Sequence, residues 1–153
     1  MIVAWRIYKP RHAASAFTGE GARLHGGRFN GKGTAVVYTS SSISLAMLEM
    51  LVHVQSSDLL LQYAVRGVTF EEGMVRRIVV ANLPANWRGH PPPAGLQRIG
   101  DEWTAGLQSA VLQVPSVIVE GESNYLLNPK HPDFPRIGVG PEQPLGFDPR
   151  LLH

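Results

Sequence analysis

GGRFNGKGTAVVYTSSSISLAMLEMLVH, residues 26–53, is the stretch of sequence that decides the fold. It joins a glycine-rich segment to a short β-branched run, a cluster of serines and an apolar segment. Serine is a typical N-cap residue, so we expect a helix to begin after Ser42 and to continue to about Gln55. Because nearly all residues of this helix are apolar, we expect neighbouring elements to cover most of its surface.

Glu49 is the one acid in that helix. Burying an unpaired carboxylate costs several kcal/mol. Glu49 should therefore either be paired in the interior or lie in the wall of a site, and we favour the site. His53 follows four residues later, within reach of Glu49, but we interpret it as a surface residue at the end of the helix.

The segment 11–34 contains six glycines, which predict an irregular loop. Their spacing matches neither the P-loop nor the Rossmann pattern. A plain flexible loop is one interpretation. Because glycine lets a backbone approach a ligand closely, and because Arg28 and Asn30 lie among these glycines, we favour a ligand-binding loop.

The composition limits the classes of function. A chain of 153 residues with 44% hydrophobic and 17% charged residues fits one globular domain with one core. The net charge is only +2 and no basic cluster is present, which argues against direct binding of nucleic acid. Eleven arginines stand against three lysines, which suits forked recognition of phosphate or carboxylate, although a GC-rich genome produces the same bias.

Two further absences narrow the location and the chemistry. Without cysteine, the chain has no disulfides, zinc–thiolate sites or thiol catalysis. The N-terminal MIVAWRIYKP does not have the form of a signal peptide, and no apolar run approaches the ~20 residues of a membrane helix. We therefore expect a cytoplasmic protein that does not insert into a membrane.

Short runs of β-branched and aromatic residues predict the strands. They cover residues 2–8, 35–39, 59–68, 74–80, 136–139 and, with an interruption at Pro115, 110–120. The remaining predictions are a helix over 96–109 weakened by two glycines, an exposed proline-rich connection over 83–95, a turn-rich segment over 124–129, and a tail over 147–153 that packs across the body. Strands outnumber helices, so we predict the α+β class.

Six residues lie in or beside the expected strands, the apolar helix and the glycine loop. They are Arg6, Arg28, Tyr38, Glu49, Ser116 and Asn124. Spacing alone does not bring them together in space.

The motifs around these residues resemble the RES-domain family, the toxins of RES–Xre toxin–antitoxin systems, which is named for an Arg, a Glu and a Ser. The matching residues are Arg28 in GGRFN, where Phe29 replaces the more usual Trp, Glu49 in LAMLEMLVH, and Ser116 in VPSVIV. WRIY, VVYTS and NYLLNPKHPDF also match. The resemblance extends over essentially the whole chain, from Trp5 to Leu151.

The resemblance implies a single RES domain over residues 1–153, with an ADP-ribosyltransferase-like fold, a mixed or antiparallel sheet core and a few helices. It implies a type II toxin that cleaves the nicotinamide–ribose bond of NAD by hydrolysis or phosphorolysis. NAD would be the substrate, with no cofactor and no metal. The implied partner is an Xre-type helix-turn-helix antitoxin that covers the active site, and a homodimer is left open.

The chemistry of the nicotinamide–ribose bond suggests catalytic roles for three of these residues. Positive charge develops on the ribose as nicotinamide leaves, and a fixed carboxylate stabilises that charge. We assign this role to Glu49. Arg28 would bind the pyrophosphate or an adjacent carboxylate through forked hydrogen bonds, and Ser116 would orient Glu49 or a ribose hydroxyl.

Three further residues are assigned to substrate binding. Arg6 would bind the same pyrophosphate or carboxylate as Arg28, and Tyr38 would stack on the nicotinamide ring. Asn124 is the third substrate-binding residue, and we assign it no specific contact.

Two alternatives to NAD breakdown remain. The first is a protein ADP-ribosyltransferase with NAD as donor, but such enzymes often carry Glu-x-Glu or Gln-x-Glu, and here Met47 stands two residues before Glu49. The second is a binding module that has lost turnover, against which the presence of every motif residue argues.

Overall fold

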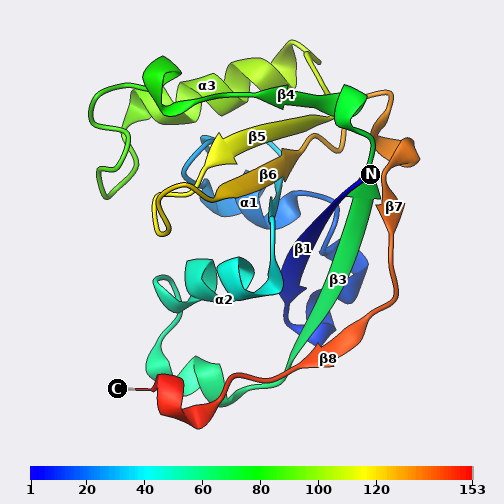
Figure 1. Ribbon diagram of the computed structural model, residues 1–153, viewed down its shortest axis with the longest axis vertical. Coiled ribbons are helices and arrows are strands. Elements are labelled where there is room, and N and C mark those ends of the chain that lie inside the picture. The colour runs from blue at the N-terminus through cyan, green and yellow to red at the C-terminus, as the bar shows by residue number, and fades with distance from the viewer. Residues whose placement is uncertain (153) are drawn as a thin grey trace.

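The computed structural model describes residues 1–152, which form a mixed sheet of eight strands with three α-helices (Figure 1). The strands are β1 (Ile2–Tyr8), β2 (Val37–Ser40), β3 (Tyr63–Phe70), β4 (Val75–Arg77), β5 (Val111–Pro115), β6 (Ser123–Leu127), β7 (Gly138–Val139) and β8 (Gln143–Leu145). The helices are α1 (Glu20–His25), α2 (Ile43–Leu51) and α3 (Ala94–Ala105). Their content and order confirm the predicted α+β class, with a mixed sheet core and a few helices.

Among the described residues, the sheet consists of two halves that meet at a single residue pair. The strand order is β4-β5-β6-β2-β1-β3-β7, with β8 also pairing with β3. β1 pairs with β3 along its whole length, whereas within the described residues β1 and β2 are paired only at Trp5 and Ser40. Beyond that pair the strands diverge, so β5 and β6 cross Figure 1 horizontally while β1 and β3 run steeply.

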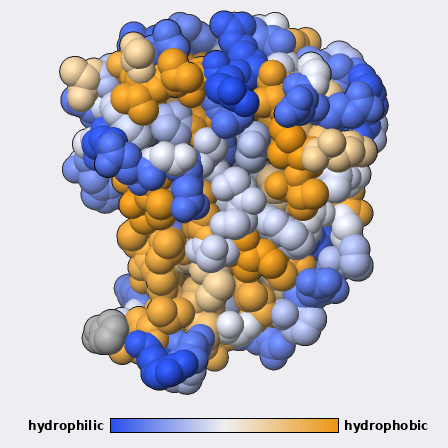
Figure 2. All heavy atoms as spheres, viewed as in Figure 1, coloured by the Kyte–Doolittle hydropathy of each residue, from blue (hydrophilic) through white to orange (hydrophobic). Residues whose placement is uncertain are grey.

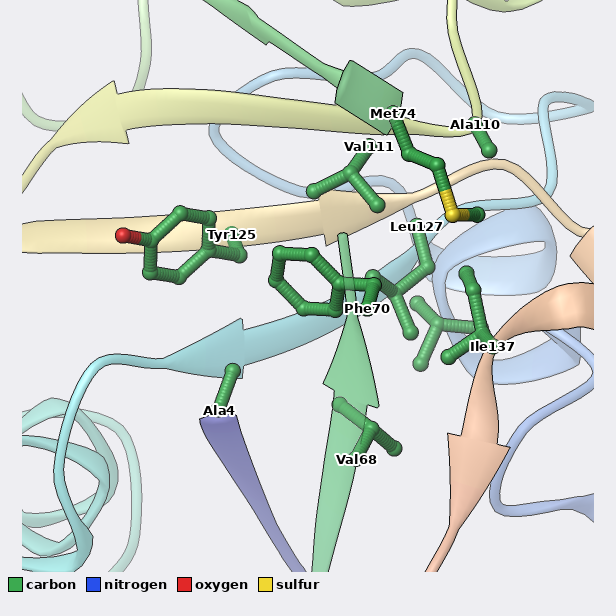
Figure 3. Packing of buried hydrophobic residues seen from close by; sticks show 10 residues of the cluster. Ala4, Val68, Phe70, Met74, Ala110, Val111, Tyr125, Leu127 and Ile137 are labelled. Carbon is green, nitrogen blue, oxygen red and sulfur yellow. The ribbon is translucent and has the colours of Figure 1, made fainter. Parts of the chain in front are cut away.

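Two apolar cores fix the halves in place. In the first, Phe70 of β3 packs edge-to-face against Tyr125 of β6, with 5.3 Å between ring centroids, and β1 adds Ala4 (Figure 3). In the second, α3 packs its Leu96 and Trp103 against the opposite face of β5 and β6. The first core joins the two half-sheets and the second supports the half that carries β2.

Helix α2 begins where the serine cluster predicts. The Ser42 hydroxyl accepts a hydrogen bond from the backbone N–H of Leu45, at 3.0 Å. The helix ends at Leu51, short of the predicted Gln55. Neighbouring elements bury Leu45 and Ala46 of this helix, but they leave Leu48 41% exposed.

An apolar surface therefore remains over α2 and the short 3₁₀ turn Ser56–Leu60 that follows it (Figure 2). Besides Leu48, it exposes Val52, Leu60 and Leu61.

The glycine-rich segment is more regular than expected. It contains a 3₁₀ turn, Pro10–Ser15, and helix α1. Gly19 and Gly26, both with φ of +75°, adjoin the two ends of α1. Glycines at the ends of a helix permit the turns on either side, so a high glycine count did not exclude a helix between them.

In the C-terminal half, one prediction is wrong and another holds only as far as Pro115. Residues 124–129 do not form a turn-rich segment, because Ser123–Leu127 is the strand β6, paired with both β5 and β2. Its run Tyr-Leu-Leu is buried, which outweighs the turn residues on either side. The predicted break at Pro115 is confirmed, since β5 ends there, but no strand follows it and the chain turns instead.

The other predictions hold with shifted ends. β1 is confirmed at both ends, and β2, β3, β4, β7 and α3 lie within a few residues of their predicted places. Phe147 of the tail packs edge-to-face on Tyr63, while the tail's last residue, His153, lies outside the described residues. Among residues 1–152, no helix has the length and apolarity needed to cross a membrane.

Candidate active site

A cavity of about 990 Å³ opens where the two half-sheets diverge. Its wall is formed by the glycine segment, α2, parts of β1, β2, β5 and β6, and the connection around Arg88 to Pro92. The volume lies at the upper end of the range typical of small-molecule sites. Five of the six predicted site residues line it: Arg6, Arg28, Tyr38, Glu49 and Asn124. Ser116 lies just behind the wall and is buried.

Glu49 is held through one carboxylate oxygen. Its Oε1 accepts hydrogen bonds from Ser116 Oγ, at 2.7 Å, and from Asn124 Nδ2, at 2.8 Å. Its Oε2 accepts none from the described residues. The sequence left open whether Glu49 is paired or lies in the wall of a site, and the structure shows both.

Ser116 is an oriented donor. Its Oγ accepts hydrogen bonds from the backbone N–H groups of Ile118 and Val119, each at 3.1 Å. A hydroxyl oxygen has two acceptor sites, so both are filled and its one proton is directed to Glu49. The turn after Pro115 supplies these N–H groups, so the break in the strand aims the hydroxyl. Ser116 is therefore arranged to position Glu49 and not to act as a nucleophile.

Arg28 links the glycine segment to the proline-rich connection. Its Nη1 donates to the carbonyl oxygens of Trp87, at 2.9 Å, and Gly89, at 3.1 Å. Burial lowers the pKa of Arg28 from its ordinary value, while the charge of Glu49 opposes that shift. Nε and Nη2 have no hydrogen-bond partner among the described residues, so these donors remain for a ligand.

Arg6 spans the divergence of the two half-sheets. Its Nε donates to the carbonyl oxygen of Ala16 and its Nη1 to that of Tyr38, at 3.1 Å. Burial lowers the pKa of Arg6, and no carboxylate of the described residues lies within 4 Å of its guanidinium. The cavity wall thus contains a half-buried cation that forms no ion pair with a described carboxylate.

Tyr38 organises the glycine segment through its hydroxyl. The hydroxyl donates to Asn30 Oδ1, at 2.6 Å, and accepts from the backbone N–H of Phe29, at 3.1 Å. A Cβ on Gly27 would lie 2.6 Å from this hydroxyl, so only glycine fits there. Burial raises the pKa of Tyr38 well above its usual range, which keeps the hydroxyl protonated. Its ring remains part of the cavity wall.

Asn30 has a structural role in this segment. It is fully buried, and its Nδ2 lies within hydrogen-bond distance of the carbonyl oxygens of Ala22, Gly31 and Thr34. The segment therefore lies against the cavity as we expected, but the Asn30 side chain points into the protein.

Sequence reasoning missed several residues of the wall. Ser40, expected only as part of an N-cap cluster, donates to Asn124 Oδ1 at 2.7 Å. Arg88 and His90 lie in the connection that we predicted to be merely exposed, and Arg88 stacks over the Trp87 ring at 4.6 Å. Loop residues show no periodicity, so only the charge of Arg88 could have drawn attention.

The cavity carries an excess of cationic groups. Among the described residues, three arginines (Arg6, Arg28 and Arg88) line it, against the one carboxylate of Glu49. His53 is exposed at the wall, and no hydrogen bond joins it to Glu49 within residues 1–152. Such a wall favours an anionic ligand.

The model of the RES domain family matches residues 3–148. The chain belongs to the RES domain family. A relative named "Toxin Res" from Yersinia enterocolitica is 43% identical over 152 residues, covering 98% of this chain and 99% of that protein. A relative named "Prs ADP-ribosylating toxin" from a Sphingobium species is 36% identical, covering 97% and 95%.

A solved structure shares the fold of this RES domain. The crystal structure of the MbcT–MbcA toxin–antitoxin complex of M. tuberculosis contains a chain that superposes with a TM-score of 0.77 at 19% identity. The match covers 99% of this chain and 86% of the other. In the RES domain described here, Arg28, Glu49 and Ser116 come from three separate segments and gather at one cavity.

Proposed function

We propose that this RES-domain protein is a toxin that cleaves the nicotinamide–ribose bond of NAD, with water or phosphate as the acceptor. The observation that carries the proposal is the setting of Glu49. This carboxylate is fixed by two donors, keeps one oxygen free of hydrogen bonds from the described residues, and faces a cationic cavity of about 990 Å³.

The fixed carboxylate suits this reaction. Positive charge develops on the ribose as the bond to nicotinamide breaks, and a preorganised anion stabilises that charge most in the transition state. Ser116 and Asn124 hold Oε1, so Oε2 faces the ribose. Nicotinamide leaves as a neutral group, so the reaction requires no strong general acid.

The cationic wall suits the pyrophosphate of NAD. After their bonds to main-chain carbonyls, Arg28 and Arg6 each keep further N–H groups, and forked donors match phosphate oxygens. The ring of Tyr38, fixed by its hydroxyl, offers an aromatic face to the nicotinamide. NAD is thus bound as a substrate and not as a resident cofactor.

Transfer of ADP-ribose to a protein is the second candidate, because the Sphingobium relative is named an ADP-ribosylating toxin. Activation of a protein acceptor would need a polar group beside Glu49. Met47 occupies the place two residues before it and packs into an apolar cluster around Tyr63 and Phe147. We therefore favour breakdown of NAD over transfer.

An antitoxin partner is part of the proposal. The related fold of MbcT was solved in a toxin–antitoxin complex, and an Xre-type antitoxin is the partner that the family resemblance implies. Val52 and Ile118 are exposed apolar residues of the cavity wall, and they provide a surface to which such a partner could bind. The proposed site of action is the cytoplasm, where NAD is available.

The test uses purified protein and adenine-labelled NAD, comparing wild type with Glu49→Gln. We expect labelled ADP-ribose or its phosphate from wild type, and turnover lower by about 10²–10³-fold in the variant, since it keeps the shape of the side chain and removes its charge. Glu72→Gln, at an exposed site outside the cavity, is the matched control and should behave as wild type.

Two results would count against this assignment. Near wild-type loss of NAD with Glu49→Gln would remove Glu49 from the chemistry. A stable labelled protein adduct without free ADP-ribose would favour the transferase.

A further inference from the structure

Ser40 occupies a distinctive place in the sheet. It is the residue of β2 that pairs with Trp5 of β1, where the two half-sheets meet, and on its other side it pairs with Asn124 of β6. The side chain is buried, and its Oγ lies 2.7 Å from Asn124 Oδ1. Residues directly opposite each other on paired strands share a face, so this contact is set by the register.

The direction of the hydrogen bonds follows from the chemistry of Glu49. An ionised carboxylate only accepts, so Asn124 must turn its NH₂ group toward Glu49 Oε1. Asn124 Oδ1 then faces Ser40 and needs a donor, which the Ser40 hydroxyl supplies. The chain of donation runs from Ser40 to Asn124 to Glu49. Without the hydroxyl, Asn124 Oδ1 would lose its donor and the amide would lose one of its two restraints.

We propose that Ser40 is a positioning residue that acts through Asn124 on Glu49. By fixing the Asn124 amide, it keeps Glu49 Oε1 occupied and Oε2 directed to the substrate. This inference rests on the proposed cleavage of NAD and deepens it. It assigns Ser40 no contact with the reacting atoms.

The first measurement is the turnover of Ser40→Ala with NAD as substrate. Loss of a group that orients a reacting side chain typically lowers activity by about 10–100-fold, and we expect a fall in kcat of about 10-fold with little change in KM. Thr104→Val is the matched control. It also removes a buried hydroxyl, which donates to the Gly100 carbonyl at 2.8 Å, but Thr104 lies outside the cavity. It should lose similar thermal stability and keep wild-type kcat.

The decisive measurement is a double-mutant cycle with Asn124→Ala. If Ser40 acts through Asn124, Ser40→Ala should lower kcat about 10-fold in the wild-type background and by less than about 2-fold in the Asn124→Ala background. Equal losses in both backgrounds would overturn the proposal, because they would mean that Ser40 acts independently of Asn124.

Two further variants sharpen the result. Ser40→Thr keeps the hydroxyl on a strand that tolerates β-branched residues, and should recover most of the activity. Ser41→Ala, at the exposed neighbouring position, should match wild type. A wild-type kcat in Ser40→Ala would also overturn the proposal.

These outcomes separate the inference from the proposed function. If wild type and Glu49→Gln both leave NAD intact, the proposed function fails. If wild type cleaves NAD and Glu49→Gln does not, while Ser40→Ala retains full kcat, only the role of Ser40 fails.

Discussion

The acid and the two arginines of the cavity are held in different ways. Glu49 is held by side chains, the hydroxyl of Ser116 and the amide of Asn124. Arg6 and Arg28 are held by main-chain carbonyls, of Ala16 and Tyr38 and of Trp87 and Gly89. Main-chain carbonyls stay in place whatever the neighbouring residue type, whereas side-chain partners can be removed one at a time. A single substitution of Ser116 or Asn124 should therefore disturb the position of Glu49, while the backbone of the fold positions the arginines.

Among the substitutions that test this difference, Arg28→Lys should lower activity the most. Arg28 binds both carbonyls through Nη1 and keeps Nε and Nη2 for a ligand, whereas lysine has a single nitrogen and cannot present a planar pair of donors besides, so we expect kcat/KM to fall by about 10²–10³-fold. The Trp87–Gly89 connection should also loosen, which would lower the Tm. Steady-state NAD cleavage and thermal unfolding measure the two effects.

The matched control is Arg77→Lys, since Arg77 donates to Gln113 at an exposed site. It should change neither quantity. Wild-type kcat/KM in Arg28→Lys would show that the guanidinium fork serves the fold and not the ligand.

Ser116→Ala should have the next largest effect. It removes a donor to Glu49 and the acceptor for two backbone N–H groups. We expect kcat to fall by about 10–100-fold, and the free energy of unfolding to fall by about 1–3 kcal/mol. Kinetics and chemical denaturation measure these.

Ser109→Ala provides the comparison for Ser116. The Ser109 hydroxyl also bridges two partners, Trp103 Nε1 and the Val111 carbonyl, but lies away from the cavity. A similar loss of stability with unchanged kcat is expected. If both variants lost kcat equally, the effect of Ser116 would be one of stability alone.

Tyr38→Phe should have the smallest effect. It removes the hydroxyl bound to Asn30 and Phe29, and we expect the free energy of unfolding to fall by about 1 kcal/mol. KM should rise because Arg28 lies in the loosened segment. Tyr63→Phe, which removes a phenol hydrogen bond to the Asp58 carbonyl outside the cavity, should lose stability without a change in KM.

We also expect wild type and Tyr38→Phe to differ in stability at alkaline pH. Burial raises the pKa of Tyr38 above its ordinary value of 10.0, so the folded state favours the protonated hydroxyl. Its contribution to stability is present below about pH 10 and is lost as pH rises further, because the unfolded chain can then ionise. Wild type should lose stability more steeply above that pH than Tyr38→Phe. Equal slopes in denaturation at pH 9 to 11 would contradict this.

The sequence predicted the parts of the fold that depend on apolar patterning. β1, α2 and α3 follow from β-branched runs, serine caps and helical patterns, and the motif residues Arg6, Arg28 and Glu49 lie at one cavity. β6 was missed because turn residues flank its short apolar run.

The partners of the site residues could not be predicted in the same way. A main-chain carbonyl carries no signal in the sequence, so the bonds of Arg28 to Trp87 and Gly89 were invisible. Gly100 illustrates the same limit. We expected it only to weaken its helix, but a Cβ there would overlap the carbonyl oxygen of Phe29, so it allows α3 to support the glycine segment.

The single pair between Trp5 and Ser40 gives the cavity an unusual origin. Among the described residues, β1 and β2 pair only at this point and then diverge, and the cavity is the space between them. Side chains alternate between faces along a strand, so slipping β2 by one residue against β6 would send Ser40 and Asn124 to opposite sides. The backbone hydrogen bonds that align β2 with β6 therefore also determine the direction of the Glu49 carboxylate, through Ser40 and Asn124.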